Sequence, residues 1–246
     1  MTSLESEHSR DAIRRRLSQA PAASYLRDFV YGAIDGAVTT FAVVAGARGA
    51  QLSDSVVVIL GVANLLADGF SMAVSNYLGT RAERQQRDRA RRIEENHIEV
   101  VPEGEREEIR QLFAAKGFSG DDLERVVDVI TADRERWVDT MMSEELGYGR
   151  DAASALRAAA ATFVAFVVVG ALPLAVYVVD AIAPGDVAHP FAWSAALTAV
   201  AFFAVGALKA RVVAQHWWRA GLETLAVGGA AAAVAYVVGV ALQGVG

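Results

Sequence analysis

Three side chains that could bind a metal ion stand within long apolar stretches of the sequence: Asp35, Asp68 and Met72. Asp68 and Met72 follow Asn64 at four-residue intervals, so the three share one gradually drifting face of a helix. A carboxylate in apolar surroundings is costly unless it faces water or a partner, so both carboxylates indicate a functional site. The alternative is a hydrogen bond between helices. A thioether beside a carboxylate favours a softer divalent ion over Mg²⁺ or Ca²⁺.

A second group of ligand-type side chains lies in the most charged part of the chain, in pairs spaced for one helix face. The pairs are Glu94 with His97, Glu105 with Glu108, and Met141 with Glu145. Carboxylates combined with an imidazole and thioethers suit a labile, borderline divalent metal such as Fe²⁺. A solvated acidic face is the alternative, and we favour it for Glu99, Glu103 and Glu107.

The elements that must position these residues are mostly long apolar helices. Three stretches without Asp, Glu, Lys or Arg each reach the roughly 20 residues that a bilayer-spanning helix needs. Two earlier spans are apolar overall but contain Asp35 in the first and Asn64, Asp68 and Asn76 in the second. The sequence therefore predicts five transmembrane helices, at residues 29–47, 55–78, 158–180, 190–208 and 221–243.

The sequence divides into four segments. Residues 1–24 form a polar tail that we expect to be loosely ordered, and residues 25–80 hold the first two spans. Residues 81–157 form a charged helical domain, and residues 158–246 hold the last three spans. We expect the charged domain to begin as a continuation of the second span. Pro102 should then start a new helix, Gly117–Gly120 should break it, and residues 121–146 should add one or two more.

The distribution of basic residues predicts the orientation in the membrane. Arginines crowd the N-terminal tail, and Lys209, Arg211 and Arg219 lie between the last two spans. By the positive-inside rule the N-terminus and residues 81–157 are cytosolic. Trp193, Trp217 and Trp218 lie near span ends, where aromatic rings favour the interface. Lys209 and Glu223 are expected to anchor the spans or to pair between helices.

Gly32 and Gly36 form a GxxxG pair around Asp35. Small residues at this spacing let two helices approach closely. The pair predicts that the first span packs either on a copy of itself or on a neighbouring helix. In the first case Ala33 and Ala37 would lie between subunits.

Composition excludes several classes of protein. The chain has no cysteine, which excludes a disulfide scaffold and thiolate chemistry. A net charge of −6 argues against a nucleic-acid partner.

Four motifs together resemble the vacuolar iron transporter family. They are the segments 31–36, 63–73, 137–147 and 217–223, which occur in the expected order and compartments, and the resemblance extends over about residues 22–246. It implies an all-α polytopic membrane protein with five transmembrane helices and a cytosolic three-helix metal-binding domain. It also implies a homodimer in the lipid bilayer that moves Fe²⁺, and in some members Mn²⁺, out of the cytosol in exchange for protons.

The resemblance also assigns residues. Asp35 and Met72 match the family's pore residues, while Glu94, Glu105, Glu108, Met141 and Glu145 match its cytosolic ligands. The chain departs from the family at two places. Ser75-Asn76 replaces a segment that carries a carboxylate in many members, and His97 stands where another Glu is expected. Both changes bear on ion preference and proton coupling rather than on the fold.

Two alternatives come from other classes of protein. A membrane-anchored ferritin-like di-iron oxidase would need two Glu-x-x-His motifs, and the chain has only Glu94 to His97. A membrane adaptor with an acidic domain would leave Asp35, Asp68 and Met72 unexplained. We therefore expect a transporter rather than an enzyme. The Ala- and Arg-rich composition, with no targeting signal or cleaved signal peptide recognised, indicates a bacterial plasma membrane.

Overall fold

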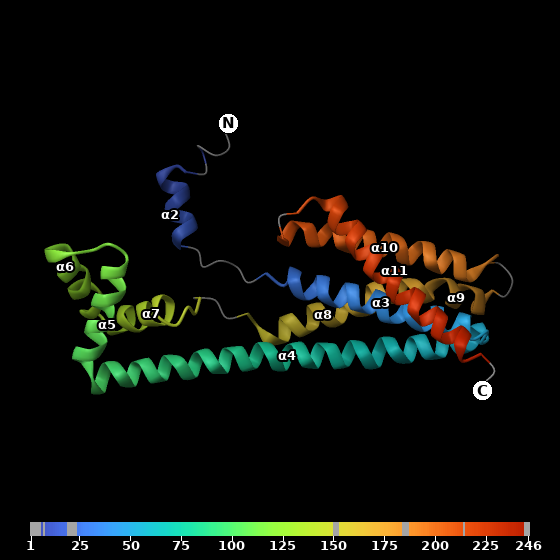
Figure 1. Cartoon of the computed structure of the whole chain (residues 1–246), viewed down its shortest axis with the longest axis horizontal. Helices are drawn as coiled ribbons and strands as arrows, with labels where there is room; N and C mark the ends of the chain where they lie inside the picture. Colours follow the sequence, from blue (N-terminus) through green and yellow to red (C-terminus); the bar gives the residue numbers. More distant parts are fainter. Residues whose placement is uncertain are drawn as a thin grey trace. The chain divides into compact units, whose positions relative to one another are not determined.

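The computed structural model describes residues 6, 8–18, 24–149, 153–183, 187–213 and 215–243. All regular elements in these ranges are helices, which confirms the predicted all-α class. The chain forms two compact units (Figure 1). One contains residues 24–80 and 154–246 and is called here the membrane unit. The other contains residues 81–153 with the N-terminal residues and is called the charged unit.

The membrane unit consists of α3 (Leu26–Gly49), the first part of α4 (Asp54–Val100), and the helices that follow residue 154. These are α8 (Ala155–Gly170), α9 (Leu172–Ile182), α10 (Pro190–Val213) and α11 (Trp217–Ala241). Helices α3, α4, α10 and α11 are each long and apolar enough to cross a membrane. Helices α8 and α9 meet at a bend of 50° and together pass the same test, so the described residues hold four spans, or five with this pair.

The third span differs from the predicted continuous helix. It breaks at Ala171, between Gly170 and Pro173. Proline fits the first turn of a helix, where its missing N–H is not needed, but it interrupts a helix interior. The carbonyl of Pro173 accepts a hydrogen bond from Ser194 Oγ at 2.6 Å, which ties the break to α10.

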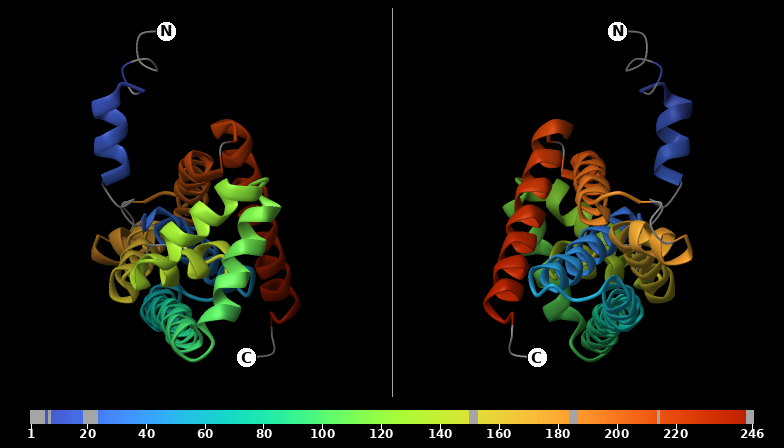
Figure 2. Two further views of the ribbon diagram at one scale, coloured as in Figure 1. Left: turned by 90° about the vertical axis from the view of Figure 1, so that its left-hand side faces the viewer. Right: turned by 90° about the vertical axis from the view of Figure 1, so that its right-hand side faces the viewer.

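Helix α3 runs through the middle of the membrane unit (Figures 1 and 2) and packs against α8, α10 and α11. It approaches α8 so closely that a Cβ on Gly32 or Gly36 would overlap the backbone of Thr162 or Phe166. The GxxxG pair therefore serves a neighbouring helix of the same chain. Ala33 and Ala37 are buried within their own chain, so their predicted place between subunits is wrong.

The charged unit is built on the last part of α4, which continues without a break to Val100 as predicted. Three helices follow: α5 (Pro102–Ala115), α6 (Gly120–Thr131) and α7 (Arg134–Glu144). They enclose a small apolar core whose fully buried members include Ile109, Val127, Val138 and Met141. Each helix buries one apolar stripe in this core, so its orientation is fixed and its polar side chains lie on the remaining faces.

The described part of the N-terminal tail includes a helix, α2 (Arg10–Ser18), where we expected loose order. Ser9 Oγ accepts a hydrogen bond from the amide of Ala12 at 3.3 Å, and Asp11 lies in the first turn. Both features stabilise a helix N-terminus, which explains the local order. Much of the remaining tail lies outside the described residues.

Candidate metal centre

The turn between α4 and α5 brings two polar faces together. Glu94 and His97 occupy the last turns of α4, and Glu105 occupies the first turn of α5. Only Val101 separates the two helices, and Pro102 starts α5 at its first position. The apolar core beneath them holds both helices in this orientation.

Ligand atoms of Glu94, His97 and Glu105 all lie within 4.8 Å of one another. His97 Nδ1 is 3.3 Å from Glu105 Oε1. Atoms at such spacings can surround one ion at the roughly 2.0–2.6 Å typical of nitrogen and oxygen ligands. The sequence paired Glu94 with His97, and the structure adds Glu105 to that pair.

Both carboxylates in this cluster are almost completely buried, with exposed fractions of 5% for Glu94 and 3% for Glu105. One oxygen of each, Oε2, has no hydrogen-bond partner among the described residues. A buried carboxylate oxygen without a donor is costly, and a bound cation removes that cost. The donor set of two carboxylates and an imidazole fits a borderline divalent ion.

Electrostatics in the cluster disfavour the metal-free ionised state. Burial, reinforced by the charges of Glu108 and Glu94, raises the pKa of Glu105 to about 7, while His97 opposes the shift. Burial also raises the pKa of Glu94 and the pKa of Glu145. Repulsion among nearby carboxylates of this kind is relieved when a divalent cation binds.

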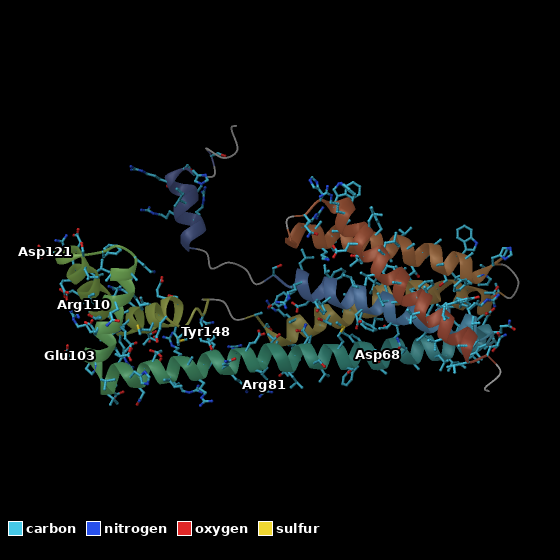
Figure 3. The ribbon with its side chains drawn as sticks, viewed as in Figure 1. Asp68, Arg81, Glu103, Arg110, Asp121 and Tyr148 are labelled. Atoms are coloured by element: carbon cyan, nitrogen blue, oxygen red, sulfur yellow. The ribbon has the colours of Figure 1, made fainter. Side chains whose placement is uncertain are left out.

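The remaining predicted ligands of the charged unit surround this cluster. Glu108 and Glu145 are exposed and interact electrostatically with Glu94. Met141 is fully buried in the apolar core, one turn before Glu145. Glu99, Glu103 and Glu107 are exposed, and Glu107 pairs with Arg110. Glu103 and Arg110 are labelled on this unit in Figure 3.

A second group of candidate ligands lies in the membrane unit. Asp35 on α3 and Asp68 on α4 are close enough to interact electrostatically. Asp35 is half-buried and Asp68, labelled in Figure 3, is exposed. Met72 lies one turn beyond Asp68 and packs at the edge of the apolar core. Asn64 Nδ2, one turn before Asp68, is buried without a hydrogen-bond partner among the residues that the structure describes.

Asp28 is a polar residue of this region that the sequence interpretation did not select. Its Oδ1 accepts a hydrogen bond from Asn76 Nδ2 at 2.9 Å, and the same amide nitrogen lies 2.7 Å from Thr162 Oγ1. Asn76, a departure from the family pattern, thus bridges α3, α4 and α8. The spacing of seven residues between Asp28 and Asp35 places both on one helix face, which is the signal that could have identified Asp28.

Comparison with known proteins identifies the family of this chain. The sequence pattern of the VIT family matches residues 26–240, which is most of the chain. A vacuolar iron transporter from Toxoplasma gondii is 36% identical over 228 residues, covering 90% of this chain and 76% of that protein. The chain belongs to the VIT family.

Two other VIT relatives match over a similar length of this chain. Vacuolar iron transporter 1 of Arabidopsis thaliana is 30% identical over 223 residues, covering 90% of this chain and 88% of that protein. The vacuolar iron transporter of Plasmodium falciparum is 30% identical over 224 residues, covering 89% and 82%. The match includes both units, so the charged unit belongs to the family as much as the membrane unit does.

VIT membership decides two questions that the residues left open. The chain is an integral membrane protein of a transporter family and not an enzyme, so the di-iron oxidase alternative falls. The relatives are eukaryotic and named for the vacuole, so the expected bacterial plasma membrane has no support.

Proposed function

We propose that the protein exports Fe²⁺ from the cytosol through a homodimeric pore, in exchange for protons, with Mn²⁺ as a second substrate. The three relatives described above are named as iron transporters. The observation that carries the proposal is the cluster of Glu94, His97 and Glu105, in which two buried carboxylate oxygens lack a partner among the described residues.

The charged unit acts as the cytosolic metal-binding domain. Basic residues gather in the N-terminal tail and between α10 and α11, which supports a cytosolic location for this unit. Glu94, His97 and Glu105 bind the ion first, with Glu108, Glu145 and Met141 as further ligands. Reversible capture of this kind raises the local Fe²⁺ concentration at the membrane.

Asp35, Asp68 and Met72 form the binding site within the membrane. The two carboxylates replace part of the hydration shell of the ion, and the thioether of Met72 disfavours hard ions such as Mg²⁺. When the metal leaves, two carboxylates close together in an apolar environment cannot both stay ionised at low cost. One of them takes up a proton, which couples metal export to proton import.

The exposure of the Asp35–Asp68 face supports a homodimer. Tyr31 lies one turn before Asp35 on the same face and is 66% exposed, and Asp68 is exposed as well. Carboxylates open to acyl chains are costly at membrane depth. A second copy placed on this face encloses the carboxylates and forms a polar path between the two chains.

Ion flux in proteoliposomes tests this function. Vesicles containing the purified protein are loaded with a pH-sensitive dye and exposed to Fe²⁺, Mn²⁺, Zn²⁺ or Mg²⁺ under anaerobic conditions. We expect Fe²⁺ and Mn²⁺ to enter the vesicles while protons leave, so that the internal pH rises. Mg²⁺ should neither enter nor change the internal pH. Metal movement without a pH change would remove proton exchange from the proposal, and equal transport of Mg²⁺ would remove the role of Met72.

A further inference from the structure

A cavity of about 590 Å³ lies where α10 ends and α11 begins. Its wall on α10 is apolar and includes Ala204, Ala207 and Leu208. Its rim is polar and includes Arg211, Gln215 and His216. The cavity therefore has an apolar side along the helix and a cationic mouth at the helix end.

The positive charge of Arg211 at this mouth is not paired with an acidic side chain among the residues that the structure describes. The basic residues after residue 187 are Lys209, Arg211 and Arg219, and the acidic one is Glu223. Glu223 Oε2 lies 3.6 Å from Lys209 Nζ, which accounts for that acid. Arg211 has no carboxylate partner within the described part of the chain, so a ligand with negative charge complements the cavity.

The cavity lies at the edge of the membrane unit. The C-terminal end of α11 packs on the end of α3, where Gly239 meets Gly46, so the start of α11 lies near the start of α3. This is the end at which the chain passes into the charged unit. Trp217 and Trp218 are 59% and 43% exposed, as expected for aromatic rings at the level of lipid headgroups.

We propose that this cavity binds an anionic phospholipid. Arg211 contacts the headgroup phosphate at the rim, with Gln215 and His216 beside it. One acyl chain lies along the wall from Leu208 to Ala204, which extends about 6 Å along α10 toward the hydrocarbon region. The apolar wall distinguishes a lipid from a free anion, which would need only the rim. Basic residues near a membrane surface contribute about fivefold each to the binding of anionic lipid.

Lipid binding to the full-length protein in neutral detergent tests the proposal without any transport assay. The probes are phosphatidylglycerol and phosphatidylcholine with identical acyl chains, and affinity is read by native mass spectrometry. We expect phosphatidylglycerol to bind preferentially. Arg211→Gln should weaken its binding about fivefold, whereas Arg48→Gln should not, because Arg48 is an exposed arginine at the opposite end of α3.

Two further measurements separate a lipid from a free phosphate. Ala204→Trp fills the exposed apolar wall while leaving Arg211 in place, and should also weaken phosphatidylglycerol binding. Inorganic phosphate at the same concentration should not compete. Equal effects of Arg48→Gln and Arg211→Gln, equal binding of both lipids, or unchanged binding in Ala204→Trp would overturn the proposal. Competition by inorganic phosphate would overturn the assignment to a lipid.

Discussion

Glu105 combines deep burial with an unpartnered oxygen and a pKa raised to about 7. Because of this raised pKa, Glu105 in the folded state keeps its proton up to about pH 7, whereas the unfolded chain releases it above pH 4.5. The stability that protonated Glu105 contributes to the folded state is therefore fully present below pH 4.5 and is lost as the pH rises through 7. Ionisation of Glu105 above this pH therefore destabilises the metal-free protein.

Glu105→Gln should therefore stabilise the metal-free charged unit at pH 8 relative to the natural protein, and should have little effect at pH 4.5. Hydrogen exchange of α5 in the full-length protein, compared between the two proteins at each pH, measures this difference. Glu99→Gln is the matched control, because Glu99 is exposed. Equal protection of natural and Glu105→Gln proteins at pH 8 would show that burial does not strain this carboxylate.

Metal binding should depend on the clustered carboxylates and not on acidic charge in general. The double variant Glu105→Ala with Glu108→Ala should weaken Fe²⁺ binding at least tenfold, since it removes two of the proposed ligands. The double variant Glu99→Ala with Glu103→Ala removes the same charge from exposed positions and should leave affinity within about twofold. Anaerobic calorimetry on the full-length protein makes the comparison, and equal losses would indicate a diffuse acidic surface.

Asp35 should be necessary for transport but not for metal capture. Asp35→Asn keeps the shape of the side chain but cannot carry charge or exchange a proton. We expect this variant to bind Fe²⁺ in the charged unit and to show no coupled flux in vesicles. Met72→Leu should be milder and should mainly reduce the discrimination between Fe²⁺ and Mg²⁺. Natural coupling in Asp35→Asn vesicles would leave this residue a packing role only.

Residue spacing predicted the pairs within each helix but not the contacts between helices. Glu94 and His97 share a face because of their separation in sequence, whereas the proximity of Glu105 depends on the tight turn at Val101. The seven-residue spacing from Asp35 could have pointed to Asp28, but not to its contact with Asn76, whose amide also meets Thr162, because these residues are distant in sequence. Local periodicity carries no information about such distant partners.

Helix α3 depends on glycine for its packing. Gly36 lies so close to the backbone of Phe166 on α8 that a Cβ there would overlap it. Gly36→Ala should therefore destabilise the membrane unit by about 1–3 kcal/mol, the usual cost of overpacking. Thermal unfolding in detergent should show a clear decrease in Tm.

Gly79→Ala is the control for this prediction. Gly79 lies on α4, and a Cβ there would meet no described heavy atom within 4 Å. Alanine favours a helix interior over glycine, so this variant should be neutral or slightly stabilising. If both substitutions lower Tm equally, close packing of α3 on α8 is not what makes Gly36 necessary.

Element boundaries followed the sequence closely where proline and glycine mark them, as at Pro102 and at Gly117–Gly120. The bend between α8 and α9 was not predicted, although Pro173 lies there. The continuous apolar run of this segment predicts a single transmembrane helix. A proline within it gives either a kinked helix or two helices, and the hydrogen bond from Ser194 belongs to a distant part of the chain.

The proposed homodimer predicts which surfaces meet. Tyr31→Cys lies on the exposed face beside Asp35 and should form a disulfide between two chains in membranes. The chain has no cysteine of its own, so the crosslink is unambiguous. Ala33 is fully buried, so Ala33→Cys should not crosslink. Val164 is 54% exposed but lies on α8 and not on the helices that carry Asp35 and Asp68, so Val164→Cys should not crosslink either. Crosslinking through Val164→Cys but not Tyr31→Cys would move the interface to another face.

The composition of the chain was sufficient to predict a membrane protein with a charged second unit, because solvent preference depends on composition averaged over a helix. The number of subunits could not be predicted from composition, since it depends on a few exposed positions. The GxxxG pair led to the wrong surface because the same motif serves packing within a chain and between chains.

The glycines of α3 have a consequence for how this family changes over generations. A Cβ on Gly36 would overlap the backbone of Phe166, and a Cβ on Gly170 or Gly239 would overlap the backbone of Gly36 or Gly46 on α3, so none of these three glycines can acquire a side chain on its own. Asp35 stands beside Gly36, and its proposed role in ion binding would constrain it for a different reason. In a library of random variants all these positions should be depleted together, and invariance alone will not separate the proposed ion ligand from the glycines that let the helices touch.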